Sequence, residues 1–96
     1  MSRPLSLLDL TPIATGTTPG AAIALSVELA ELADRLGYHR VWYAEHHNTP
    51  GLASGSPEIM IEHIASRTER IRVGAGGVML PNHAALKIAE NFRLLE

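Results

Sequence analysis

The sequence predicts an α/β protein in which short parallel strands alternate with helices. Three apolar segments of strand length, residues 5–10, 40–44 and 71–80, are each followed by a turn-rich stretch and then by a segment of helical periodicity. This order puts parallel strands in one sheet and covers the sheet with helices. Two architectures fit the pattern, a doubly wound sheet and a (β/α)8 barrel. A complete barrel needs about 250 residues, more than the 96 present.

The first unit begins with LSLLDL at residues 5–10, which we expect to be a buried strand. A helix is then predicted over residues 19–36. Thr18 is its N-cap, Pro19 suits the first helical position, and Gly37 is the expected stop. Its apolar face is predicted to consist of Leu25, Leu29, Leu32 and Leu36, and its polar face of Glu28, Glu31, Asp34 and Arg35.

The second unit starts with RVWYA at residues 40–44, a β-branched and aromatic run that is typical of a strand. The loop at residues 45–56 is long for a compact connection, and long loops of this kind often carry function. Ser56 and Pro57 then repeat the cap-plus-proline start, and the second helix is predicted to run to about Glu69.

The third unit holds the predicted strand at residues 71–80, which Pro81 ends. Asn82 is the expected cap of a third helix. The apolar face of this helix is predicted to consist of Ala85, Ala89, Phe92 and Leu95. No glycine or asparagine stop follows that face before Glu96, and we therefore expect residues 1–96 to be the N-terminal part of a larger domain, a fragment of its parent protein.

Composition excludes several classes of function. Eight Lys and Arg against ten Asp and Glu give a net charge of −2, without the basic patch that nucleic acids or anionic membranes require. The N-terminal apolar stretch is too short for a signal peptide or a membrane span. The absence of cysteine removes disulfides and thiolate chemistry, and it fits a cytoplasmic protein.

Glycines at positions 74, 76 and 77 stand where a core strand would place large side chains. They do not form a dinucleotide fingerprint, because Met79 occupies the place of the last glycine and the pattern lies in a third strand. One interpretation is that they let the strand twist or bulge. The other is that Gly76 and Gly77, which lack a Cβ, let a flat ligand pack against the peptide planes.

Glu45, His46 and His47 follow the second strand, at the edge where parallel α/β proteins bind ligands. Proton transfer or hydrogen bonding is one interpretation, because histidine titrates near neutral pH. The other is a pair of exposed loop histidines and a glutamate that is hydrogen-bonded to the backbone. No metal site is predicted, because adjacent side chains in an extended segment diverge. His83 is predicted to be a surface residue in the first turn of the third helix, and the alternative is that it faces the strand ends.

Three segments together resemble a known family. They are SLLDLTPI at the start, GYHRVWYAEHHN at residues 37–48, and VGAGGVMLPNHAALKIAENFRLL at residues 73–95. They resemble the N-terminal part of the bacterial luciferase-like flavin-dependent oxidoreductases, often called luciferase-like monooxygenases. The EHH motif and the glycine-rich strand that ends in Leu80 and Pro81 are specific as a pair.

The resemblance implies the first three βα units of a (β/α)8 barrel that holds reduced FMN at the carboxyl ends of its strands, where oxygen adds to the flavin. By this resemblance His46 takes the role assigned to flavin-hydroperoxide and base chemistry. Gly76 and Gly77 take the place of the segment that backs the isoalloxazine ring, often through a non-proline cis peptide. The residues that bind the phosphate lie on later strands of the family, beyond this chain.

The parent enzyme implied is a monooxygenase that acts on paired donors with incorporation or reduction of molecular oxygen. Its partners would be a small organic substrate, oxygen, a separate flavin reductase and further copies of itself in a homo-oligomer. The 96-residue chain alone is expected to be inactive. Two alternatives stay open: a short non-catalytic relative whose open sheet edge pairs with another chain, and a deazaflavin-dependent dehydrogenase of the same superfamily.

Overall fold

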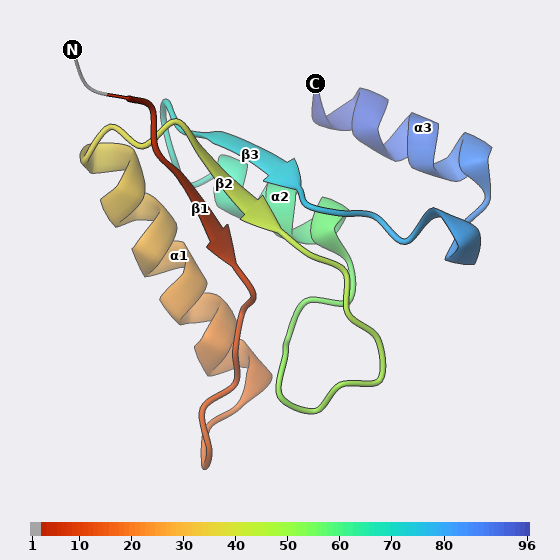
Figure 1. The fold of residues 1–96 in the computed structure, drawn as a ribbon, viewed down its shortest axis with the longest axis horizontal. Helices are drawn as coiled ribbons and strands as arrows, with labels where there is room; N and C mark the ends of the chain where they lie inside the picture. The colour runs from red at the N-terminus through yellow and green to blue at the C-terminus, as the bar shows by residue number, and fades with distance from the viewer. Residues whose placement is uncertain (1–2) are drawn as a thin grey trace.

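A computed structural model of the chain describes residues 3–96 and shows three parallel strands in the order β1-β2-β3 (Figure 1). The strands are β1 (Ser6–Asp9), β2 (Arg40–Tyr43) and β3 (Arg72–Ala75). The helices are α1 (Pro19–Arg35), α2 (Pro57–Ala65), the short 3-10 helix η1 (Leu80–Asn82) and α3 (Ala85–Leu95). The predicted alternation of parallel strands and helices is therefore confirmed.

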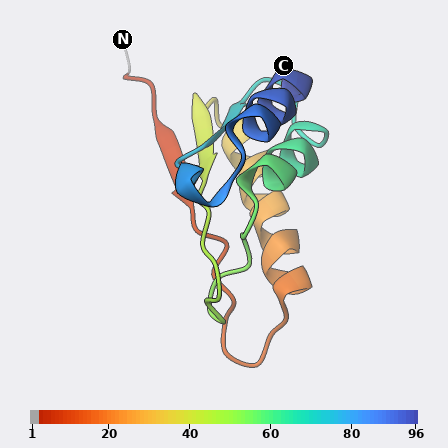
Figure 2. The same ribbon diagram turned by 90° about the vertical axis from the view of Figure 1, so that its right-hand side faces the viewer.

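The core lies between the sheet and helices α1 and α2, which cover the same face (Figure 2). Val41 and Tyr43 point into it from β2, the central strand. Its members are Ala30, Ala33, Val41, Tyr43, Met60, Ile64 and Ile71. The opposite face of the sheet is open, and the prediction that the first strand is buried is wrong: Leu8 is 56% exposed because it points to that open face.

Helix α1 begins as predicted but buries a different face. The Thr18 side chain accepts a hydrogen bond from the Ala21 N–H at 3.1 Å, and Gly37 follows the helix with a φ of 82°, a left-handed conformation that favours glycine. The predicted apolar stripe, Leu25, Leu29, Leu32 and Leu36, is exposed. The buried residues are Ala22, Ser26, Ala30, Ala33 and Asp34. Small side chains occupy most of the buried face, because they let the helix backbone lie close to the sheet.

Helix α2 ends at Ala65, four residues before the predicted end at Glu69. Its last carbonyls are taken by side chains: Ser66 Oγ donates to the His63 carbonyl at 3.0 Å, and Thr68 Oγ1 donates to the Ile64 carbonyl at 3.0 Å. Such side-chain bonds compete with continued helix. The chain can therefore turn toward β3 directly after the helix.

Strand β3 is shorter than the predicted strand at residues 71–80. The N–H of Gly76 donates to the Tyr43 carbonyl at 2.7 Å, and no later residue continues the pairing with β2 among the residues described. The peptide bond between Gly76 and Gly77 is cis, a feature that the family resemblance implied for this segment. From this point the chain leaves the sheet and runs into η1.

Helix α3 begins at Ala85 with Ala84 as its N-cap, so Asn82 is not the cap. Asn82 instead lies in η1, an extra turn that the sequence did not reveal. The half-buried face of α3 consists of Ile88, Asn91, Phe92 and Leu95, whereas Ala85 and Ala89 are exposed. The predicted apolar face is thus half correct.

Within residues 3–96, none of the helices has the length and apolar character that crossing a bilayer demands.

Candidate functional site

The candidate site lies at the carboxyl ends of β2 and β3, which are neighbours in the sheet (Figure 1). Glu45, His46 and His47 follow β2, and Gly76 and Gly77 follow β3. Because the two strands are parallel, both segments leave the sheet at the same edge. The fold therefore brings together the two groups of residues that the sequence singled out.

The Glu45 side chain forms hydrogen bonds with three other residues of the site. Its Oε1 accepts a hydrogen bond from the Met79 N–H at 3.0 Å, while its Oε2 contacts Nε2 of His47 and lies 2.8 Å from Nε2 of His83. Burial by itself would raise the pKa of this carboxyl. The hydrogen bonds from His47, Met79 and His83 outweigh that effect and hold the pKa at about 2. Glu45 is therefore a buried carboxylate that stays ionised at neutral pH.

His83 is not the surface residue in the first turn of a helix that was predicted, and the structure agrees with the alternative that it faces the strand ends. It lies 38 positions from Glu45 in sequence, yet η1 turns the chain back so that its ring reaches the carboxylate. The available signal was Glu45 itself, because a carboxylate at the end of a buried strand needs donors from elsewhere in the chain. The sequence does not say which of the later donors meets it.

The ring atoms of His47 and His83 and a carboxylate oxygen of Glu45 lie within 4.8 Å of one another, a grouping that could hold a metal ion. No metal site was predicted, because His46 and His47 diverge and the sequence has neither an HExxH motif nor a cysteine. His46 is indeed outside this group, as side-chain divergence predicted. Both histidines nevertheless form hydrogen bonds with Glu45, so an ion would have to displace the protons between them.

His46 differs from His47 in its surroundings. Its backbone N–H donates to the Ser54 carbonyl at 3.0 Å, which fixes it against the end of the long loop. The side chain is half-buried, and its Nδ1 is buried without a hydrogen-bond partner among residues 3–96. A buried ring nitrogen without a partner is uncommon in a folded protein and points to a functional role for His46, whereas the Nε2 of His47 is already engaged by Glu45.

The glycines of the third strand separate into two groups. A Cβ built at Gly74 would lie 2.9 Å from Cζ3 of Trp42, and one at Gly76 would lie 3.3 Å from Cε3 of the same ring. A Cβ at Gly77 would meet no atom within 4 Å. Gly74 and Gly76 thus make room for Trp42, and Gly77 is the glycine that faces open space.

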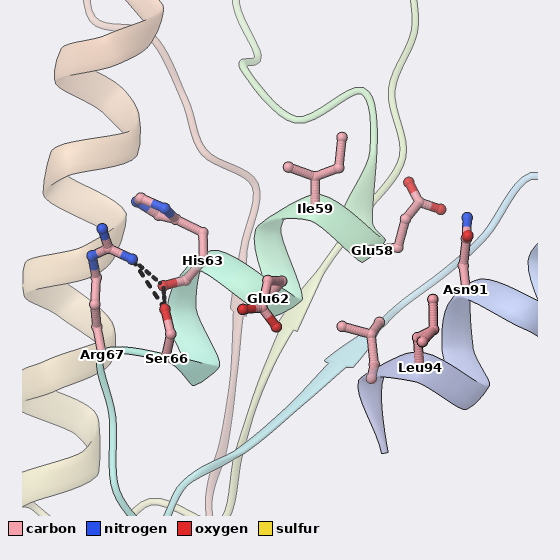
Figure 3. A pocket seen from close by; sticks show the side chains of 9 residues that line it. Glu58, Ile59, Glu62, His63, Ser66, Arg67, Asn91 and Leu94 are labelled. Atoms are coloured by element: carbon pink, nitrogen blue, oxygen red, sulfur yellow. Dashed lines mark hydrogen bonds between the residues drawn. The ribbon is translucent and has the colours of Figure 1, made fainter.

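Two hollows lie outside this cluster. One, of about 570 Å³, lies between α2 and α3 and is shown in Figure 3, where Arg67 donates to the His63 carbonyl. It contains none of the residues that the sequence singled out. The other, of about 690 Å³, lies along β3, between Trp42 and Gly74 of the sheet and Ile88 and Phe92 of α3. There the guanidinium of Arg40 stacks over the Trp42 ring, 4.7 Å from its centroid.

Comparison with known proteins identifies the family. The family model described as luciferase-like monooxygenase matches residues 4–96. An uncharacterized Bacillus subtilis protein, YceB, is 54% identical over 92 residues, which are 96% of this chain and 28% of that protein. A protein named luciferase-like monooxygenase from Escherichia coli K12 is 50% identical over 90 residues, which are 94% of this chain and 27% of that protein.

Two solved structures share the fold. The structure of apo-MsnO8 matches with a TM-score of 0.94 at 49% identity, over 98% of this chain and 28% of that chain. The oxygenating constituent of 3,6-diketocamphane monooxygenase from Pseudomonas putida, a type II Baeyer-Villiger monooxygenase in complex with FMN, matches with a TM-score of 0.90 at 20% identity, over 98% of this chain and 26% of that chain.

These matches confirm the predicted fold class, the first three βα units of a (β/α)8 barrel, and reject the doubly wound sheet. The chain spans little more than a quarter of the length of the proteins it matches. Its matching segment includes every residue of the candidate site. The chain belongs to the luciferase-like monooxygenase family.

Proposed function

We propose that residues 1–96 are the N-terminal part of a flavin-dependent monooxygenase, which uses reduced FMN and molecular oxygen on a small organic substrate. The observation that carries this proposal is the buried Nδ1 of His46, which has no hydrogen-bond partner among residues 3–96 and lies at the sheet edge where Gly77 faces open space. Family membership and the FMN bound to a protein of the same fold support the choice of cofactor.

In this proposal the residues of the chain have separate roles. His46 forms a hydrogen bond with the reacting part of the cofactor and moves a proton there, and Gly77 leaves the backbone bare so that a flat ring can lie against it. Bound reduced flavin supplies the electrons that activate oxygen. Glu45 stays outside this contact, because its carboxylate is engaged by Met79 and two histidines.

The remaining functions belong to the rest of the barrel. The phosphate of FMN is bound by residues on later strands, so activity requires the part of the protein that lies beyond these three βα units. A separate reductase supplies reduced flavin, and the enzyme is a homo-oligomer in the cytoplasm.

The test uses the full-length enzyme that the proposal requires. Reduced FMN is titrated without oxygen, and the incorporation of labelled oxygen into product is then measured after oxygen is admitted. The wild-type enzyme should bind reduced FMN, and His46→Ala should lose product formation. His39→Ala is the matched control, because His39 is an exposed histidine before the other end of β2, and it should behave as the wild type.

Two results contradict the proposal. Binding of a reduced deazaflavin in preference to reduced FMN, with hydride transfer and no use of oxygen, would identify a dehydrogenase of the same superfamily. Binding of neither cofactor by a folded, self-associated protein would identify a non-catalytic pairing module, which the exposed leucines of α1 would suit.

A further inference from the structure

We infer that Glu45 is a positioning residue, which fixes the proton positions of His47 and His83 and holds the segment after Gly77 against the end of β2. The part of this inference that concerns FMN rests on the proposed function. The part that concerns the histidines and the backbone stands on the contacts of the chain alone.

Glu45 connects the loop that follows β2 with a segment more than 30 positions later in the sequence. Its side chain is only 1% exposed and follows β2 after one intervening residue, Ala44. Oε1 accepts the Met79 N–H at 3.0 Å, in the segment that leaves β3. Oε2 accepts from His47 in the loop after β2 and from His83, 2.8 Å away, at the end of η1. Both oxygens of this buried group are therefore satisfied by specific donors.

The ionised state of Glu45 determines where the histidine protons lie. A carboxylate without its proton can only accept hydrogen bonds, so Nε2 of His47 and Nε2 of His83 must both carry hydrogen. When either ring is neutral, its Nδ1 is then the nitrogen with a free lone pair. One buried carboxylate thus selects the same tautomer for two histidines of the site.

The same carboxylate helps to fix the position of the Gly77 backbone relative to the end of β2. Upstream, the Gly76 N–H donates to the Tyr43 carbonyl at 2.7 Å. Downstream, the Met79 N–H donates to Glu45 at 3.0 Å. Both acceptors belong to the end of β2, so the short stretch from Gly76 to Met79 is held at its two ends by one strand. Gly77 lies between these two hydrogen bonds. No atom lies within 4 Å of a Cβ added there, so we infer that the two hydrogen bonds determine the position of its backbone.

The experiment compares Glu45→Gln with Asp34→Asn in the full-length protein labelled with 15N-histidine. Glutamine keeps the shape of Glu45, but its amide group can satisfy either the Met79 N–H or both histidine donors, not all three. Asp34 is the matched control, because it is also a buried carboxylate that accepts backbone N–H groups, from Glu69, Arg70 and Ile71, away from the site. Both variants lower stability, so stability alone does not distinguish them.

The readouts are the 15N signals of His47 and His83, assigned with His47→Gln and His83→Gln, and the dissociation constant of FMN. In the wild type and in Asp34→Asn, Nε2 of both rings should give the signal of a protonated nitrogen. In Glu45→Gln either at least one ring should change tautomer or the Met79 N–H should lose its acceptor, and in both cases FMN binding should weaken on the order of tenfold, a loss that Asp34→Asn should not show.

Histidine signals and FMN affinity that are both unchanged in Glu45→Gln would overturn the inference. Tight equimolar binding of Zn²⁺ by the wild type, with displacement of the Nε2 protons, would also overturn it and would make the three residues a metal centre. If the wild type does not bind FMN, the proposed function fails, yet a change of tautomer confined to Glu45→Gln still supports the positioning role.

Discussion

The indole ring of Trp42 lies against Gly74, so closely that a Cβ on residue 74 would stand 2.9 Å from the ring. The two residues are direct partners in the parallel register of β2 and β3. The same ring limits the space at Gly76, where an added Cβ would lie 3.3 Å from it. Gly77 is free of this restriction, and substitutions at Gly74 and Gly77 should therefore have different consequences.

Replacing Gly74 by alanine should destabilise the protein by about 1–3 kcal/mol, because the new methyl group forces the Trp42 ring or the strand to move. Gly77→Ala should change the free energy of unfolding by less than about 0.5 kcal/mol. Urea unfolding of both variants measures the difference. Adding Trp42→Leu to Gly74→Ala should recover part of the loss, and equal effects at the two glycines would contradict this account.

Side chains at Gly77 should weaken the binding of FMN in order of size. The position has room for a Cβ in the chain itself, so Gly77→Ala and Gly77→Val introduce atoms into the space proposed for the flavin ring. Valine should raise the dissociation constant of FMN by about tenfold or more, and alanine by less. Flavin fluorescence titration provides the measurement. If valine binds FMN as tightly as glycine does, the glycine serves the backbone alone.

His46→Ala should reduce the rate of product formation more than His47→Ala does. Nδ1 of His46 is buried without a partner among the residues described, whereas Nε2 of His47 is engaged by Glu45. Loss of a group that transfers a proton lowers rates by about 100-fold or more. Product and hydrogen peroxide are to be measured together at equal occupancy of FMN. A larger loss of product in His47→Ala would assign the proton transfer to His47 instead of His46.

The stability of the protein should depend on pH through the carboxyl group of Asp34. Hydrogen bonds from the backbone N–H groups, first that of Glu69, lower the pKa of Asp34 below its ordinary value of 3.8. The folded state therefore favours the ionised form, and this contribution is full well above pH 3.8 and is lost as the pH falls below it. The wild type should be more stable than Asp34→Asn at neutral pH, and the difference should shrink in acid. A difference that is constant with pH would contradict the role of the charge.

The 96-residue chain by itself should self-associate or lose its fixed packing. Leu25 and Leu36 of the first unit are 62% and 66% exposed, and β1 and β3 each have one unpaired edge. It should also fail to bind FMN measurably, since the residues proposed for the phosphate lie on later strands. Light scattering and an FMN titration of the purified chain test this. A monodisperse monomer that binds FMN would identify a self-sufficient flavin-binding domain.

Local signals in the sequence were enough to predict the order of the elements and the position of the site. Thr18 and Gly37 mark the two ends of α1 through a cap and a left-handed residue, which depend on a few neighbouring atoms. The EHH motif falls at the end of β2 because a short β-branched and aromatic run precedes it. These features depend on the nearest residues in the chain and can be recognised without knowing what lies across the sheet.

The tertiary structure alone decided which faces and which partners are used. Asp34 has the spacing of a polar, exposed residue, but it is buried because it accepts three backbone N–H groups from residues 69–71. His83 has no local signal, and it joins the site only because η1 returns the chain to Glu45. Gly74 is required by a ring on the neighbouring strand. Each of these depends on contacts between residues about 30 or more positions apart, whose energies no periodicity within a single segment contains.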